Sequence, residues 1–466
     1  MKRLSKNFFS MILSDLGRRF LGFISVTYLA RKLGVSDFGA INVGFTILAY
    51  AVMASSGGLG TYGTRSIARG EDAGIVNRIL SLRLVSSLVT FILIVFGAVF
   101  FVQSPLMARL ILVFCLSLFA SAFLLDWYFQ GKEEMGVIAV GRLASAALYL
   151  GLILVLVHSS EDLLWVAGAA VTGDICATII LLILYRRRQE SGRYRFNLSG
   201  WKEMMSQAFH IGGGSMLAQA SVNLPPIVIG ILMTNAEVGV YSAASKIVFF
   251  LLLVDRVAGT LLLPASSRLH ASSPEMFSST LEVGVRWIVV IALPLSVGGT
   301  ILAGTILPFV FGSQYAASVD VFRILIWFSF FTLLHTIYAT GLIAIGQERL
   351  FGKIMMISGL LYALSVVICT MAFGVLGTAG AVVGSEAMTV ILVRRAFSGF
   401  VQLRLPRSLI NTAAAAVVMG IVLFWFAHTQ VLIAVAVGAV TYTVAIFMLR
   451  AVNTKDVSDL VRRLSW

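Results

Sequence analysis

Apolar runs of about 20 residues recur from one end of this 466-residue chain to the other. A helix of that length crosses a hydrocarbon core of about 30 Å. The composition agrees, since 59% of the residues are hydrophobic and 12% are charged, against about 45–50% and 25% in soluble domains. The sequence therefore excludes a soluble globular protein and predicts an all-α integral membrane protein with about fourteen transmembrane helices. The predicted spans are residues 8–31, 38–60, 79–102, 106–130, 135–158, 162–185, 205–233, 238–264, 280–303, 319–345, 353–374, 376–393, 408–428 and 430–449.

The 35 Lys and Arg residues are distributed unevenly over the connections between these spans. With the N-terminus inside, most of them fall on inside connections, and only Arg31, Lys32 and Arg109 fall on outside connections. This asymmetry follows the positive-inside rule and predicts that both termini are cytoplasmic. The net charge of +14 is thereby explained by topology. It does not indicate nucleic-acid binding, which would need a basic soluble face.

Three short segments occur twice in the same order, with six predicted spans between the copies. Each match is short, but their shared order and similar spacing favour an internal repeat over coincidence. The paired segments are residues 37–39 with 237–239, 131–133 with 346–348, and 167–174 with 379–386.

Because six is even, both copies have the same orientation in the membrane. This predicts two pseudo-symmetric six-helix bundles around a central cavity that opens alternately to either side, which is the architecture of a carrier. We expect an N-terminal six-helix bundle with a cytoplasmic linker over residues 1–200 and a second six-helix bundle over 201–400. Two additional transmembrane helices and a cytoplasmic tail follow over 401–466.

Charged residues inside the predicted spans are the first candidates for a functional site, because a lone charge there costs at least about 2.5–3.5 kcal/mol. Arg18 and Arg19 lie near the middle of the first span, with Asp15 three and four residues before them. Asp15 could neutralise one arginine and leave the other for substrate. Arginine suits a phosphate or diphosphate, because its planar donors bind oxyanions bidentately.

Further basic residues lie in the other spans. Lys246 and Arg256 share a face of the eighth span and are candidates for an anionic ligand. Arg142 and Arg286 lie near span ends, where snorkelling to headgroups explains them equally well. Arg323 is expected to pair with a nearby acid three residues before it, Asp320. Together these residues predict a cationic cavity.

Acidic and amide side chains within the spans have two interpretations each. Asp174 and Glu386 occupy matching places in the repeat and, like Asp15, are candidates for coupling to protons or sodium ions. The alternative for each is a carboxylate paired with arginine that holds helices together. Gln219 and Asn223 continue a stripe from Ser215 that is predicted to end at a helix break at Pro225–Pro226. That stripe could line the cavity or join helices.

No enzyme or metal site can be assembled from the remaining motifs. Residues 58–63 fit G-x-G-x-x-G, yet they end a membrane helix and follow no strand. Residues 346–353 resemble a phosphate loop with the wrong spacing. The histidines and cysteines have no metal-ligand spacing, and no nucleophile with a base can be nominated. We therefore expect no catalytic residues, no metal and no cofactor.

Three segments resemble the polysaccharide transport family of oligosaccharide flippases. That family belongs to the multidrug, oligosaccharidyl-lipid and polysaccharide exporter superfamily. The resemblance covers nearly the whole chain, and the aromatic stretch WYFQG is its most specific element. The segments are LARKLGVSDFG over residues 29–39, LGTYGTR over 59–65 and DWYFQGKE over 126–133.

The resemblance implies a substrate consisting of an oligosaccharide on a polyprenyl diphosphate, moved from the cytoplasmic to the outer leaflet for O-antigen, capsule or exopolysaccharide assembly. Arg65, at the end of the second segment, joins the candidate contacts for the diphosphate or glycan. The implied location is a bacterial or archaeal cytoplasmic (inner) membrane. The implied partners are the lipid-linked substrate, the bilayer, and a polysaccharide polymerase with chain-length proteins.

Three alternatives stay open at this point. Two lie within the superfamily: a flippase for a peptidoglycan lipid precursor and a multidrug cation antiporter. The count of fourteen spans is closer to the peptidoglycan lipid flippases, whereas the basic residues count against cation export. The third is a membrane-embedded polymerase or ligase, which the short outward loops disfavour.

Overall fold

The computed structural model describes residues 2–70, 73–188, 194–403, 408–427 and 429–452 of the chain, and at the N-terminal end it describes side chains from Asp15 onward. Within these ranges the regular elements are all helices. The chain divides into two compact units, Met1–Gly239 and Val240–Trp466. The predicted domain boundaries at residues 200 and 400 stay a prediction.

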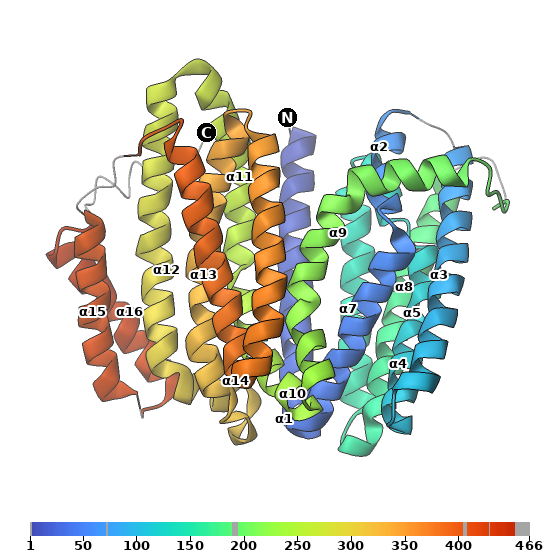
Figure 1. The fold of residues 1–466 in the computed structure, drawn as a ribbon, viewed down its shortest axis with the longest axis horizontal. Coiled ribbons are helices and arrows are strands. Elements are labelled where there is room, and N and C mark those ends of the chain that lie inside the picture. The colour runs from blue at the N-terminus through green and yellow to red at the C-terminus, as the bar shows by residue number, and fades with distance from the viewer. Residues whose placement is uncertain (1, 71–72, 189–193, 404–407, 428, 453–466) are drawn as a thin grey trace. The chain divides into compact units, whose positions relative to one another are not determined.

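The first unit is organised around α1, a helix that folds back on itself at Gly34. This residue has φ 80° and ψ 171°, a conformation that glycine adopts without steric cost. Figure 1 shows α1 running away from the N-terminus and then returning toward α2. Helices α3, α4, α7 and α9 pack against α1. The elements are α1 Lys2–Ser56, α2 Leu59–Ala68, α3 Ala73–Phe101, α4 Pro105–Cys115, α5 Ser117–Ala122, α6 Asp126–Gly131, α7 Met135–Leu156, η1 Ser160–Asp162, α8 Leu163–Arg188 and α9 Trp201–Leu232.

Two glycines of the repeated segments meet where α1 crosses the start of α10 (Asn235–Leu251). A Cβ atom on Gly39 would lie 1.7 Å from the carbonyl oxygen of Asn235, and one on Gly239 would lie 2.0 Å from that of Val35. The two contacts are reciprocal, because each glycine touches the residue four positions before the other. Small residues at both places let the two backbones approach closely. This reciprocity is the pattern that a twofold repeat produces.

The second unit contains another helix that folds back, α14, at Gly374 (φ 62°). Hydrogen bonds join its two arms, with Ser365 Oγ 2.9 Å from Ser385 Oγ and Thr370 Oγ1 2.7 Å from Thr378 Oγ1. Figure 1 shows the two arms side by side. Within this unit the elements after α10 are α11 Leu253–Ser272, α12 Pro274–Phe311, η2 Ser313–Tyr315, α13 Ser318–Ala344, α14 Glu348–Ser398, α15 Ser408–Phe426 and α16 Val431–Met448.

The predicted number of spans is not confirmed. In the described residues ten helices are long and apolar enough to cross a membrane, or eleven if the bent α9 is counted as one span. Helices α1 and α14 each contain two predicted spans. The predicted span 238–264 is interrupted at Leu252, and α10 is short for a span at 17 residues. The all-helical membrane architecture is confirmed, and the count of fourteen is not.

The predicted break at Pro225–Pro226 is wrong. Helix α9 continues through both prolines to Leu232 and instead bends by 77° between its parts Trp201–Gly214 and Gln219–Leu232 (Figure 1). Three consecutive glycines, residues 212–214, directly precede the bend. Glycine lowers the stability of a helix interior, so this run is the weak point of α9.

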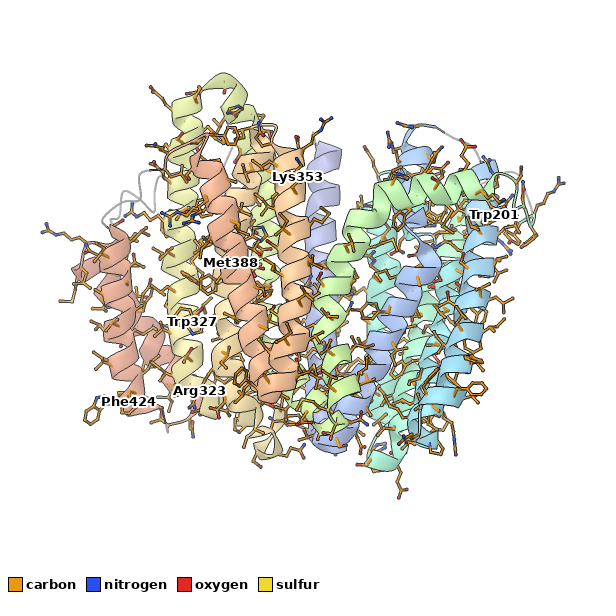
Figure 2. All side chains as sticks on the ribbon, in the orientation of Figure 1. Trp201, Arg323, Trp327, Lys353, Met388 and Phe424 are labelled. Carbon is orange, nitrogen blue, oxygen red and sulfur yellow. The ribbon has the colours of Figure 1, made fainter. Side chains whose placement is uncertain are left out.

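Figure 2 labels two cations of the second unit, one on α14 and one on α13. Lys353 lies near one end and Arg323 near the other. The Arg323 Nη1 atom is 2.8 Å from Asp320 Oδ1, which confirms that predicted ion pair. On α15, Phe424 and Trp425 are 75% and 81% exposed, as expected of side chains that face lipid.

Candidate functional site

One face of α2 presents the polar residues of the LGTYGTR segment and of the turn after it. Tyr62, Arg65, Ser66 and Arg69 are spaced by three and four residues, so they share one face of the helix. Both guanidinium-bearing side chains are exposed, while Ser66 is buried. The helix thus directs two cations toward the same space.

The opposite face of α2 packs against α6, which contains the DWYFQGKE segment. A Cβ atom on Gly63 would lie 2.4 Å from Cε3 of Trp127, so the indole ring covers the glycine. The Thr64 hydroxyl donates to the carbonyl oxygen of Trp127 at 3.1 Å. Residues 127–129 are all buried in one hydrophobic cluster of the first unit. The two segments therefore form one packed structure, which fixes the direction of Arg65.

Helix α9 approaches α2 through a second pair of glycines. A Cβ atom on Gly58 (φ 79°) would lie 2.3 Å from the carbonyl oxygen of Ala208. One on Gly212 would lie 2.6 Å from the Cα atom of Gly58. Both positions need glycine, because backbone atoms cannot move aside as a flexible side chain can. This contact sets how closely the first part of α9 faces the polar side of α2.

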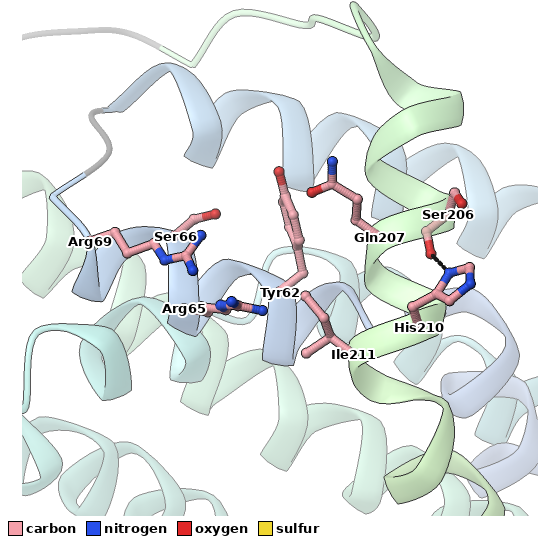
Figure 3. Close-up of a pocket in the computed structure, with 8 residues that line it drawn as sticks. All are labelled: Tyr62, Arg65, Ser66, Arg69, Ser206, Gln207, His210 and Ile211. Carbon is pink, nitrogen blue, oxygen red and sulfur yellow. Dashed lines mark hydrogen bonds between the residues drawn. The ribbon is translucent and has the colours of Figure 1, made fainter.

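A pocket of about 350 Å³ lies between α2 and the first part of α9 (Figure 3). The imidazole Nδ1 of His210 lies 2.7 Å from the carbonyl oxygen of Ser206, and the Gln207 amide donates to Glu203 at 3.3 Å. The pocket is lined by Tyr62, Arg65, Ser66, Arg69, Ser206, Gln207, His210 and Ile211.

The pocket has the chemistry of an oxyanion site. Among the described residues, its lining holds two guanidinium groups, an imidazole, a phenol, an amide and two hydroxyls, and no carboxylate. In the part of the chain that the structure describes, neither Arg65 nor Arg69 has an ion-pair partner. Guanidinium groups bind phosphate oxygens through two parallel N–H donors, and they stay charged at any working pH. Such an arrangement favours a phosphate or diphosphate over a cation.

The predicted site residues of the first helix form a compact ion cluster. Asp15 Oδ1 accepts from Arg18 Nη2, and Asp15 Oδ2 accepts from Arg19 Nε, both at 3.1 Å. One carboxylate thus bridges two guanidinium groups, where the sequence suggested that one arginine would be left over. The cluster retains one net positive charge. Arg18 is 43% exposed and Arg19 28%, so both can still be approached.

The remaining basic and amide candidates are distributed over α9, α10 and α11. Asn223 donates to the carbonyl oxygen of Gln219 at 3.0 Å, a bond within the helix, and Gln219 is exposed. Lys246 is partly buried and has no ion pair in the described ranges. The Arg256 side chain lies outside the described residues. Of the predicted contacts, Arg65 is the one that lines the pocket.

The two acids matched by the repeat have different surroundings. Asp174 is partly buried on α8. Glu386, on α14, has its Oε1 atom 3.0 Å from Nδ1 of His335 on α13. Asp255 accepts a hydrogen bond from the hydroxyl of Thr336, which also belongs to α13.

Sequence reasoning missed Arg69, Gln207, His210 and His335. Arg69 lies in the connection between the predicted spans 38–60 and 79–102, and its signal was its helical spacing from Tyr62 and Arg65. Gln207 and His210 lie in the first two turns of the predicted span 205–233, where polar residues are common. His335 had a signal of its own, because it is an ionisable residue in the middle of the predicted span 319–345.

Comparison with sequence families gives one match. The family described as "Polysaccharide biosynthesis protein" matches residues 4–270. Two similar proteins are the "Probable low-salt glycan biosynthesis flippase Agl15" of Haloferax volcanii and a "Putative O-antigen transporter" of Escherichia coli. The first is 23% identical over 98% of this chain and 99% of its own length. The second is 22% identical over 80% of this chain and 91% of its own length.

Two solved structures share the fold. The lipid II flippase MurJ in an inward closed conformation aligns with a TM-score of 0.76 and 14% identity, over 93% of this chain and 97% of that one. An inward-facing multidrug resistance MATE transporter of the MOP superfamily aligns with a TM-score of 0.66 and 13% identity. The latter alignment covers 82% of this chain and 95% of the MATE chain. At these identities the alignments establish the fold.

Proposed function

The chain belongs to the polysaccharide biosynthesis protein family, as its sequence motifs predicted, and from this membership we propose that it is a flippase for lipid-linked oligosaccharides. The substrate is an oligosaccharide on a polyprenyl diphosphate, transferred from the cytoplasmic to the outer leaflet by alternating access. The relatives' names, glycan biosynthesis flippase and O-antigen transporter, support this substrate class.

The observation that carries the proposal is the basic pocket between α2 and α9. Residues 61–78 form an inside connection under the positive-inside rule, so the α2 wall of the pocket lies at the cytoplasmic end of the first unit. A lipid diphosphate arriving from the cytoplasmic leaflet meets Arg65 and Arg69 there. The glycan needs polar volume, and the polyprenyl tail stays in the bilayer. Arg18, Arg19 and Lys246 supply further positive charge.

The direction of transport agrees with the charge of the substrate. With the cytoplasm negative, outward movement of an anion is favourable by about 2.3 kcal/mol per charge for each 100 mV. The membrane potential therefore favours export. Return of the empty carrier is coupled to the potential or to a proton or sodium gradient, for which Asp15, Asp174 and Glu386 are candidates.

The topology, location and mode of action of the protein follow from this role. Both termini are cytoplasmic, and the protein resides in the cytoplasmic (inner) membrane. It performs transport without catalysis and without a cofactor. A polysaccharide polymerase and chain-length proteins use the exported unit on the outer side.

A flippase for a peptidoglycan lipid precursor is the second candidate, favoured by the fold shared with MurJ. Both substrates would place a diphosphate in the same basic pocket. They differ in the glycan, so the choice between them is tested by the sugar and not by the phosphates. Cation export has less support, because two guanidinium groups line the pocket.

The test is leaflet exchange in vesicles that contain the purified protein and a fluorescent polyprenyl-diphosphate oligosaccharide. We expect protein-dependent exchange that is faster with a negative interior potential. A parallel sample with a peptidoglycan lipid precursor identifies the preferred glycan. Absence of exchange under every potential and ion gradient, with uptake of a small cation instead, would overturn the proposal.

The pocket is tested in the same vesicles by the double variant Arg65→Ala/Arg69→Ala. Charge-assisted hydrogen bonds contribute about 1.5–3 kcal/mol each, so exchange at low substrate concentration should fall by about tenfold or more. The matched control is Lys32→Ala/Arg109→Ala, which removes two exposed cations from the predicted outer side. Equal rates in the two double variants would refute a diphosphate site in this pocket.

A further inference from the structure

Four polar side chains from three helices meet inside the second unit. The Nδ1 atom of His335 lies 3.0 Å from Glu386 Oε1, and the Thr336 hydroxyl donates to Asp255 Oδ1 at 2.5 Å. Asp255 is on α11, Glu386 is on α14, and the other two residues are neighbours on α13. Asp255 is within electrostatic range of both His335 and Glu386. The group is therefore one coupled cluster.

The cluster is shielded from solvent by its own unit. The side chains of His335 and Glu386 are 14% and 17% exposed. Nε2 of His335 is buried without a hydrogen-bond partner among the described residues. Ionisable groups within membrane helices are costly and mark ion or proton paths. Nδ1 of His335 thus contacts the Glu386 carboxylate, and Nε2 is available for a further hydrogen bond or proton.

Among the described side chains, this cluster itself contains two acids and one base. Helix α12 also packs on α13, and it contributes apolar residues around Ile337, while its Arg286 donates to the carbonyl oxygen of Ala451 at 2.7 Å. The first half of α12 also contains an acid, Glu282, one turn before Arg286. On α14 the cations Arg394 and Arg395 follow Glu386 by about two turns. With Asp255 and Glu386 ionised, a protonated His335 leaves the cluster at a net charge of −1, and one further proton neutralises it.

We infer that His335, Glu386 and Asp255 form a proton-binding site that couples the transport cycle to the proton gradient. The inference rests on the proposed function and identifies the coupling ion. One proton binds to the cluster from the outer side, and the same proton leaves to the cytoplasm in the course of each return of the empty carrier. Imidazole is a proton acceptor near neutral pH and a poor ligand for sodium, which prefers oxygen atoms, so the histidine selects the proton.

Two measurements on the full chain test this inference, and the first does not depend on transport. The protein is labelled with ¹⁵N-histidine in lipid nanodiscs, and the His335 signal among the five histidines is assigned by its loss in His335→Gln. We expect this signal to change with pH, and we expect the midpoint of that change to be displaced in Glu386→Gln, which removes the carboxylate beside Nδ1. Asp320→Asn is the matched control, because it neutralises a carboxylate on the same helix outside the cluster, and it should leave the midpoint unchanged. A His335 signal that does not titrate, or that is indifferent to Glu386→Gln, would overturn the site.

The second measurement is leaflet exchange with an imposed pH gradient. An acidic outer side should accelerate exchange by the native protein by about fivefold or more, and Glu386→Gln and Asp255→Asn should abolish this response. The Asp320→Asn control should retain it. Exchange that ignores the pH gradient, or that responds to sodium and persists in His335→Gln, would refute proton coupling and leave the flippase proposal standing. Absence of all exchange would refute the flippase proposal, while the nanodisc titration would still decide whether the cluster binds protons.

Discussion

Replacing Gly39 by alanine should destabilise the protein strongly. The new Cβ atom would lie 1.7 Å from the carbonyl oxygen of Asn235 and 2.8 Å from the amide nitrogen of Gly239. An ordinary carbon–oxygen contact is about 3.3–3.6 Å, so the two backbones would have to separate by more than about 1.5 Å. Both partners are backbone atoms, and no change of rotamer can relieve the clash. Overpacking costs about 1–3 kcal/mol where neighbours can adjust, so we expect about 3 kcal/mol or more here.

The assay is thermal unfolding in detergent, followed with a thiol-reactive dye. Cys115 is buried and becomes reactive on unfolding, and replacing the other two cysteines, Cys176 and Cys369, by serine leaves it as the single reporter. Gly22→Ala is the matched control, because it lies on the same helix and its Cβ atom would meet nothing within 4 Å. That variant should melt at or above the native temperature, since alanine is the better helix former. If Gly39→Ala melts together with Gly22→Ala, the close crossing does not exist.

Two further predictions concern the ion pairs of the first unit. Arg18→Ala and Arg19→Ala should each retain exchange, because one guanidinium still supplies positive charge beside Asp15, whereas the double variant should lose it. Adding Asp15→Asn to the double variant removes the carboxylate that both arginines contact in the native protein, so recovery of exchange would show that the arginines only neutralise it. Asp126→Asn should lower stability by about 1–3 kcal/mol, because it breaks the 2.6 Å pair with Arg142 and removes an anion that interacts with the partly buried Arg83. Arg142→Ala should cost less than about 1 kcal/mol, since that side chain is 49% exposed, and equal losses in thermal unfolding would contradict this assignment.

Local patterns in the sequence were sufficient for the helical membrane fold and for part of the site. The length of the apolar runs predicted the helices. Gly34 lies in the connection expected between the first two predicted spans, and Gly374 is the last residue of the predicted span 353–374. The repeat of residues 37–39 at 237–239 predicted that these two segments are structurally equivalent. Gly39 and Gly239 make equivalent contacts where the segments cross. The LGTYGTR segment indicated Arg65 through its resemblance to the oligosaccharide flippases.

Features that depend on tertiary contacts could not be predicted in the same way. The pocket joins residues 62–69 to residues 206–211, and the sequence contains no signal that these two segments meet. His335 and Glu386 are 51 positions apart, and their contact depends on how α13 packs on α14. The sequence prediction placed the bend of α9 at the prolines because proline is the more familiar helix breaker. The helix bends instead after three consecutive glycines, which stabilise a helix less than other residues do.

The central claim is that a basic pocket recognises the diphosphate of a lipid-linked oligosaccharide. It is tested most directly by offering the protein one oligosaccharide on two lipids, a polyprenyl diphosphate and a polyprenyl monophosphate, and comparing the initial rates of leaflet exchange. The native protein should prefer the diphosphate by about tenfold, and Arg65→Ala/Arg69→Ala should lose that preference. Equal rates for the two lipids in the native protein would contradict the account.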